Sequence, residues 1–301
     1  MKPLMILSAI ITIIALAGFW AVRFGPLGFV QGYFLSPPSD PAGSVTLFEP
    51  QDGLKYFVYL PHDYAADGGE YPVIYHLHGA MPFPWSIAKK MVRADIGALA
   101  NQIEGLVSAG EAEPTIIVAP YDGFGFSMWS DSSSGHEMVE TQIVAELMPK
   151  IEQGYAVSGS REATSIQGFS MGGFGALKIG LKYPDRFARV TSWDGAVHSW
   201  ETLSSSRASI VENMFASEAD FDRHSPWKMA ETLAANPDGV RPKITLFSGR
   251  MEAPATYTAA FQEHLTSLGI EFRFSTADCP HDIFCFMTPE RIADVYSGLG
   301  K

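Results

Sequence analysis

The chain has 301 residues, a formal net charge of -12, 47% hydrophobic residues and 18% charged residues. This length suits one large α/β domain or two small ones, and the composition allows a sizeable core. The excess of negative charge argues against nucleic acid or an anionic membrane surface as a partner.

The first predicted element is an uncharged apolar run, residues 4–22, which lies between Lys2 and Arg23. A run of 19 residues is about enough to cross a bilayer once. Within it, Ala15-Leu16-Ala17 resembles the small-residue cleavage site of a signal peptide. We therefore expect an exported protein, whether secreted, periplasmic or membrane-anchored, with residues 1–23 as either a cleaved signal peptide or a membrane anchor.

Residues 24–43 are rich in proline, glycine and serine, which is typical of a linker, so a single domain is expected over residues 44–301. Short runs of apolar and β-branched residues predict eight strands in this domain. They cover Ser44–Phe48, Leu54–Leu60, Val73–His78, Thr115–Ala119, Thr164–Gly168, Arg189–Trp193, Lys243–Phe247 and Glu271–Thr276.

Helical periodicity appears between most of the later strands. It covers Ile87–Val107, Met138–Ile151, Met171–Tyr183, Tyr257–Leu268 and Pro289–Leu299. The turn Gln51-Asp52-Gly53 predicts a hairpin between the first two strands. A hairpin followed by alternating strands and helices predicts a mostly parallel eight-stranded sheet with helices on both faces. Residues 204–236 lack a predicted strand, and we expect a helical insertion there.

The most informative motif is Gly168-Phe169-Ser170-Met171-Gly172, which stands between a predicted strand and a predicted helix. In this context the G-x-S-x-G pattern is typical of a nucleophile elbow, a sharp turn that lifts the serine hydroxyl into a cleft. Glycines two positions before and after the serine permit the strained backbone and the close packing of such a turn. Ser170 is therefore the candidate nucleophile.

A serine nucleophile needs a histidine as general base and a carboxylate that orients the histidine. Of the eight histidines, only His281 follows the last predicted strand, where the base is expected. The acid should follow a strand between Ser170 and His281 in the sequence. Glu252 follows the seventh predicted strand and Asp194 the sixth, and we favour Glu252.

An oxyanion hole needs two N–H donors, and the sequence suggests Met171, directly after the nucleophile, and Ala80, which follows a strand ending in His78-Gly79. His76 and His78 share a strand face, but no third ligand accompanies them, so neither a metal nor a cofactor is expected. Cys279 and Cys285 flank His281. An oxidising compartment would allow a disulfide that restrains this loop, and two buried free thiols are the alternative.

Further motifs make the chain similar to the esterase D-like family of α/β-hydrolases over about residues 44–300. They are Tyr75–Gly79, Ser127–Ser132, Glu146–Ile151, Gly168–Gly173, Lys182–Phe187 and His281–Phe284. The family includes feruloyl and acetylxylan esterases, S-formylglutathione hydrolases and mycolyltransferases. The resemblance implies an α/β-hydrolase fold with the nucleophile, base and oxyanion donors named above. The acid of the family usually lies in a Gly-x-x-Asp turn, which reads Gly249-Arg250-Met251-Glu252 here.

We therefore expect an exported serine esterase that acts through an acyl-enzyme on a small-molecule or carbohydrate ester, without a cofactor. Trp85, Trp129 and Phe284 are candidates for contacts with the substrate, and Glu140 is expected to be structural. The alternatives are an acyltransferase, in which an alcohol replaces water, and a non-catalytic binding protein on the same fold.

Overall fold

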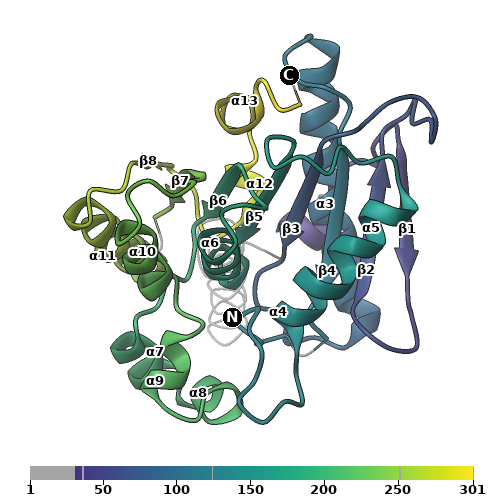
Figure 1. Ribbon diagram of the computed structural model, residues 1–301. Helices are drawn as coiled ribbons and strands as arrows, with labels where there is room; N and C mark the ends of the chain where they lie inside the picture. Colours follow the sequence, from purple (N-terminus) through teal and green to yellow (C-terminus); the bar gives the residue numbers. More distant parts are fainter. Residues whose placement is uncertain (1–30, 36, 124, 251, 301) are drawn as a thin grey trace, which may run out of the picture.

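The computed structural model describes residues 31–35, 37–123, 125–250 and 252–300, in which eight strands form one sheet (Figure 1). Their order is β1-β2-β4-β3-β5-β6-β7-β8. The pairs β1–β2 and β2–β4 are antiparallel, and the other pairs are parallel. The strands are β1 (Ser44–Phe48), β2 (Lys55–Leu60), β3 (Val73–Leu77), β4 (Ile116–Tyr121), β5 (Thr164–Phe169), β6 (Arg189–Trp193), β7 (Lys243–Ser248) and β8 (Arg273–Thr276).

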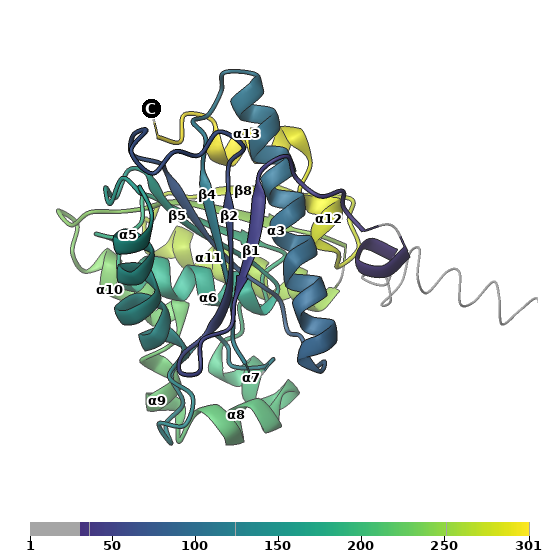
Figure 2. The same ribbon diagram turned by 90° about the vertical axis from the view of Figure 1, so that its right-hand side faces the viewer.

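Helices cover both faces of the sheet, as Figure 2 shows from the side. One face carries η1 (Gln31–Leu35), a single π-helical turn, with α3 (Trp85–Ser108), α12 (Ile283–Phe286) and α13 (Pro289–Tyr296). The other face carries α4 (Val139–Thr141), η2 (Gln142–Leu147), α5 (Met148–Gly154), α6 (Met171–Lys182), α10 (Pro226–Ala234) and α11 (Glu252–Ser267). The remaining helices, α7 (Trp200–Ser206), α8 (Ala208–Met214) and α9 (Glu218–Asp222), form most of the expected helical insertion.

The predicted α/β architecture with a mostly parallel sheet is confirmed, and each predicted strand is present within two residues at either end. Strands β3, β4 and β5 are buried along their whole length because helices cover both of their faces, which explains their continuous apolar sequences. One predicted helix, Met138–Ile151, is divided into α4, the π-type turn η2 and α5. The apolar run 4–22 lies outside the described residues, and none of the helices that are described is long and apolar enough to span a membrane.

Two glycines bring the start of α6 against the end of β3. A Cβ atom at Gly172 would lie 1.9 Å from the carbonyl oxygen of Leu77, and one at Gly168 would lie 2.2 Å from the carbonyl oxygen of Gly172. Both obstacles are backbone atoms, which cannot rotate away as a side chain can. Glycine at these two positions therefore allows the approach that places Ser170 beside the loop following β3.

We predict that Gly172→Ala lowers the free energy of unfolding by at least about 3 kcal/mol, because the added methyl group would overlap the β3 backbone. Gly105→Ala is the matched control, since Gly105 is exposed within α3 and an added Cβ meets no atom within 4 Å. That change should stabilise the protein by about 0.5–1 kcal/mol through helix propensity. Urea unfolding of both variants measures the difference, and equal stability of the two would contradict the packing argument.

Candidate active site

Ser170 occupies a strained turn between β5 and α6. Its backbone has φ 56° and ψ -116°, a conformation that a residue with a side chain rarely adopts. The N–H of Ser170 donates to the carbonyl of Trp193 at 3.0 Å, and its carbonyl accepts from the N–H of Ala196 at 2.9 Å. These two hydrogen bonds fix the turn to the end of β6, so the predicted elbow geometry is present at Ser170.

His281 lies between the candidate nucleophile and a carboxylate. Its Nε2 is 2.9 Å from Oγ of Ser170, and its Nδ1 is 2.6 Å from Oδ2 of Asp194. A proton on Nδ1 would be donated to the carboxylate, which leaves Nε2 as an acceptor for the serine hydroxyl. The ring of Phe169 lies 4.5 Å from the imidazole, centroid to centroid, and packs on one side of it.

The carboxylate beside His281 is Asp194, so our preference for Glu252 was wrong. Asp194 follows β6, which is the neighbour of β5 in the sheet, and its side chain has no exposed surface. Its second oxygen, Oδ1, accepts the N–H of Gly249 at 2.7 Å. The Gly249 turn, which we expected to carry the acid, therefore supplies a hydrogen bond to it instead. Glu252 is the first residue of α11.

The two predicted oxyanion donors come from the end of β3 and the start of α6. The N–H groups of Ala80 and Met171 make no hydrogen bond to any residue that the structure describes. At Gly79 a Cβ atom would lie 3.3 Å from Cβ of Ser170, so this loop passes close to the serine. Ala80, in this loop, and Met171, next to Ser170 in sequence, thus have backbone donors that are not used by the described residues.

The loop after β3 is supported from beneath by Trp129, whose indole N–H donates to the carbonyl of His78 at 3.2 Å. A second hydrogen bond joins the N–H of Met81 to the carbonyl of Gly125 at 3.1 Å. Trp129 has no exposed surface and cannot contact a substrate, so its predicted substrate-binding role is wrong. Its role is to position the backbone that carries Ala80.

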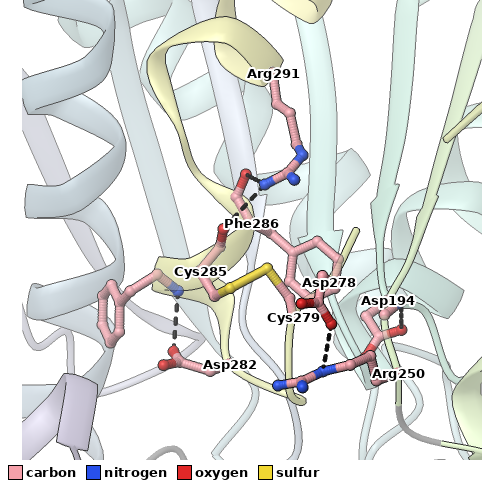
Figure 3. Close-up of a disulfide and its surroundings, with 10 residues drawn as sticks. Asp194, Arg250, Asp278, Cys279, Asp282, Cys285, Phe286 and Arg291 are labelled. Atoms are coloured by element: carbon pink, nitrogen blue, oxygen red, sulfur yellow. Dashed lines mark hydrogen bonds and ion pairs between the residues drawn. A yellow bond between two sulfur atoms is a disulfide. The ribbon is translucent and has the colours of Figure 1, made fainter. Parts of the chain in front are cut away.

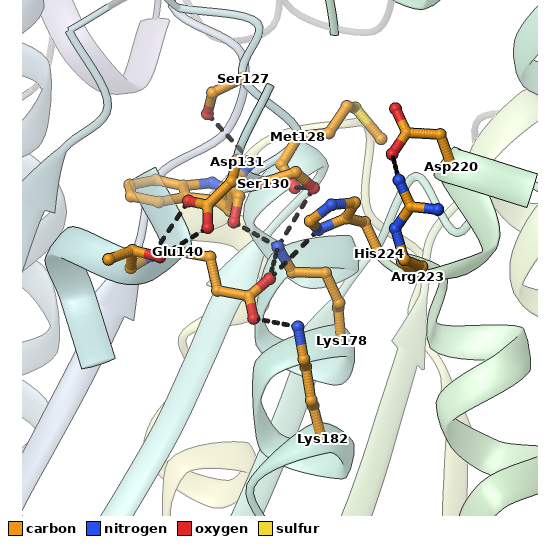
Figure 4. A network of polar contacts seen from close by, with 12 residues as sticks. Ser127, Met128, Ser130, Asp131, Glu140, Lys178, Lys182, Asp220, Arg223 and His224 are labelled. Atoms are coloured by element: carbon orange, nitrogen blue, oxygen red, sulfur yellow. Dashed lines mark hydrogen bonds and ion pairs between the residues drawn. The ribbon is translucent and has the colours of Figure 1, made fainter. Parts of the chain in front are cut away.

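The carbonyl of Trp129 is held by Lys178, which belongs to a buried cluster of charges with Glu140 and His224 (Figure 4). The ammonium group of Lys178 donates to the carbonyl of Trp129 and lies 2.9 Å from Oε2 of Glu140. Glu140 also contacts Lys182 at 2.5 Å and His224 at 3.4 Å. Burial alone would raise the pKa of Glu140, but Lys178, His224 and Lys182 together hold it far below its usual value. The predicted structural role of Glu140 therefore has a physical basis.

Ser170 and His281 open into a cavity of about 330 Å³. Trp85 and Phe284 are absent from its described lining, which differs from our expectation. Trp85 instead donates to Glu49 at 2.6 Å and packs on Tyr121, and Phe284 packs against Tyr33. The apolar lining that the sequence did not indicate comprises Met81, Pro82, Phe83, Met91, Phe126 and Phe169, together with Tyr33.

Comparison with known proteins identifies the family. A family model described as putative esterase matches residues 49–282 of the chain. The chain belongs to this esterase family. It is 31% identical over 246 residues, or 75% of its length, to a protein of Mycobacterium tuberculosis named Esterase MT1326. That match covers 50% of the relative, so the chain spans about half the length of the curated relatives it matches.

Two solved structures show the same fold. A ferulic acid esterase superposes with a TM-score of 0.66 and 23% identity, covering 84% of this chain and 97% of that one. An S-formylglutathione hydrolase from Agrobacterium tumefaciens gives a TM-score of 0.65 and 21% identity, with 86% and 95% of the two chains covered. The expected α/β-hydrolase fold and the resemblance to these esterases are therefore confirmed.

A disulfide between Cys279 and Cys285 closes the short loop before α12 (Figure 3), and His281 lies within this loop. The two cysteines are six positions apart in the sequence, so the covalent ring is small. The carbonyl of Cys279 accepts the N–H of Arg250 at 2.8 Å, and the carbonyl of Cys285 accepts from the guanidinium of Arg291 at 3.0 Å. The loop is thus tied at both ends, which reduces the conformational entropy lost when the imidazole is held in place.

Asp282, the residue after His281, is mostly buried, and burial raises its pKa to about 6. Its Oδ1 accepts the N–H of Phe284 at 3.0 Å and so caps α12. That hydrogen bond lowers the pKa less than burial raises it. The carboxyl group is consequently easier to accommodate when protonated than when charged.

A raised carboxyl pKa in the folded state favours folding below the unfolded pKa, and this contribution is lost as the pH rises through about 6. Asp282→Asn keeps a cap acceptor and removes the charge. We predict that this variant gains up to about 3 kcal/mol relative to the wild type between pH 4 and pH 8. Urea unfolding at the two pH values measures the gain. A difference between variant and wild type that does not change with pH would contradict the raised pKa.

Proposed function

We propose that this protein is a serine esterase that hydrolyses a carboxylic ester through Ser170, His281 and Asp194. The observation that carries the proposal is the continuous chain of contacts from Asp194 to His281, at 2.6 Å, and from His281 to Ser170, at 2.9 Å. Ser170, at one end of this series of contacts, lines a cavity together with Ala80, and the backbone N–H groups of Ala80 and Met171 have no partner among the described residues. Membership of the esterase family supports the same reaction class.

In the first step His281 Nε2 accepts the proton of Ser170 as Oγ attacks the ester carbonyl. The imidazolium that forms is stabilised by the negative charge of Asp194. This buried carboxylate accepts two hydrogen bonds, one from His281 and one from the N–H of Gly249. The N–H groups of Ala80 and Met171 donate to the developing oxyanion. Collapse of the tetrahedral intermediate transfers the proton from His281 to the leaving alcohol and leaves an acyl-enzyme.

In the second step His281 takes a proton from water as the water attacks the acyl carbonyl. Collapse of this intermediate breaks the bond to Oγ, releases the acid and returns the proton from His281 to Ser170. The apolar lining of the cavity supports an uncharged ester as the substrate. Apart from His281, its described lining has no ionisable side chain other than the phenol of Tyr33. A charged group placed there would lose its hydration without gaining a partner, so we propose a small-molecule or carbohydrate ester with an apolar moiety.

We also propose that the enzyme acts after export. The disulfide beside His281 supports an oxidising compartment, because such bonds persist mainly outside the cytosol. The signal peptide or membrane anchor expected at residues 1–23 lies outside the described residues. Mass spectrometry of the N-terminus of the protein isolated from its own cells would distinguish the two. A cleaved signal peptide would be missing from the protein, whereas a membrane anchor would remain.

The proposed function is tested by reaction of the full chain with a fluorophosphonate probe, followed by location of the adduct by mass spectrometry. We expect one adduct per chain, on Ser170, because only an activated serine reacts quickly with this probe. The variants Ser170→Ala and His281→Ala should give no adduct at the same exposure. A folded wild-type protein that remains unlabelled and hydrolyses no ester would refute the proposal. Added alcohols then separate hydrolysis from acyl transfer, since a transferase forms new ester products.

The assignment of the acid gives a second prediction. Asp194→Asn should lower kcat/KM for an ester by a factor on the order of 10³–10⁴, because the amide disfavours the required histidine tautomer. Glu252→Gln is the control and should change kcat/KM by less than about threefold, as expected if Asp194 and not Glu252 is the acid of the triad. Steady-state kinetics on one p-nitrophenyl ester compares them. A large loss in Glu252→Gln with an active Asp194→Asn would reverse the assignment.

A further inference from the structure

We infer that Tyr33, which precedes the part of the chain matched by the esterase family, is a specificity-determining and positioning residue of the ester pocket. The inference rests on the proposed function. Tyr33 lies in η1, within the stretch that the sequence indicated only as a linker. Figure 2 shows η1 as the purple turn beside α3 and α12. The family match begins at residue 49, so this wall of the pocket is additional to the matched region.

Tyr33 lines the same cavity as Ser170 and His281. It is held there by two contacts. Its hydroxyl donates to Oδ1 of Asp95 at 2.6 Å, and its ring meets the ring of Phe284 edge-on at 4.8 Å. Neither partner lines the cavity itself, but both belong to elements beside it: Asp95 lies on α3, which contributes Met91 to the lining, and Phe284 lies on α12, directly after the loop with His281.

The fit of the segment is close. A Cβ atom at Gly32 would lie 2.1 Å from Cδ2 of Phe284 and 3.2 Å from Oδ1 of Asp282. Only a residue without a side chain lets η1 pack on α12 in this way. By contrast, Leu35 at the other end of the turn is 66% exposed. The turn therefore has one face fixed against the site and one face in solvent.

The hydroxyl of Tyr33 also joins a buried group of polar side chains in which Asp95 Oδ2 and His76 Nε2 have no hydrogen-bond partner among the described residues. Asp95 has no exposed surface, and its Oδ2 lies 3.6 Å from Nε2 of His76. His76 Nδ1 is 3.1 Å from the amide nitrogen of Gln167, and Gln167 Oε1 accepts the indole N–H of Trp193 at 2.8 Å. Gln167 and Trp193 lie on the strands that end at the candidate nucleophile and acid. Loss of the phenol hydroxyl would leave the buried Asp95 carboxylate without the one hydrogen bond that it accepts from a described residue.

Burial, then Asp95, then Asp282 raise the pKa of Tyr33 well above its usual value, so the phenol stays protonated and keeps its donor role. Its two functions are separable by substitution. Tyr33→Phe keeps the ring as a wall and removes the donor to Asp95. Tyr33→Ala removes the wall as well and enlarges the cavity on the side of α3 and α12.

The test uses the full chain and two pairs of esters. p-Nitrophenyl acetate and octanoate vary the acyl group, and ethyl and octyl acetate vary the alcohol. In Tyr33→Ala we expect the long-to-short ratio of kcat/KM to rise about tenfold or more in one pair, because a pocket that loses a wall tolerates added methylenes. Tyr33→Phe should keep both ratios within about twofold while kcat falls about threefold to tenfold with little change in KM. Leu35→Ala, in the same turn, is the control and should match the wild type.

Unchanged ratios in a folded Tyr33→Ala protein would overturn the inference and leave the proposed function intact, because the wild type would still hydrolyse both esters. If Tyr33→Ala does not fold, Tyr33→Leu keeps part of the apolar contact and tests the same ratios. A wild-type protein that neither hydrolyses an ester nor reacts with the fluorophosphonate probe would overturn the proposed function, and the inference would fall with it.

Discussion

The left-handed backbone at Ser170 is the constraint on which the rest of the site depends. A serine at φ 56° is held against its own preference only if the surrounding backbone leaves no alternative. Here two glycines let α6 rest on β3, and hydrogen bonds to the end of β6 hold the turn from the other side. The same contacts bring together the strand ends that carry Ala80, Ser170 and Asp194, so one local strain organises three separate segments.

Sequence reasoning located the strands and the serine because these depend on local pattern, such as buried apolar runs and glycines at fixed offsets. It could not choose the acid, since Asp194 and Glu252 both follow a strand and both precede His281. The deciding fact is which strand end faces the imidazole. The turn at Gly249 contributes a backbone N–H that donates to Asp194, and not the carboxylate that we expected there. Those are long-range relations, and one sequence without its sheet geometry does not contain them.

The aromatic residues illustrate the same limit. Trp129 resembles a ligand-binding residue in sequence, yet in the fold it is buried, its indole supports the loop after β3, and its carbonyl is held by Lys178. Tyr33 is the opposite case, a cavity residue that the sequence did not indicate. It lies in a stretch rich in proline, glycine and serine, yet its hydroxyl donates to the buried Asp95, 62 positions away. Side-chain direction and distant pairing decide both cases, whereas composition reports only average exposure.

The three members of the proposed triad are held in place in two different ways, by the sheet and by a disulfide-closed loop. Ser170 and Asp194 leave neighbouring parallel strands whose last residues, Phe169 and Trp193, are paired, so the sheet itself fixes their separation. His281 instead stands in a small covalent ring beyond the last strand. Reduction of this disulfide would therefore free the imidazole to move away from an otherwise intact serine–aspartate frame. Inactivation by a reductant would then leave the sheet folded, and reoxidation would reverse it.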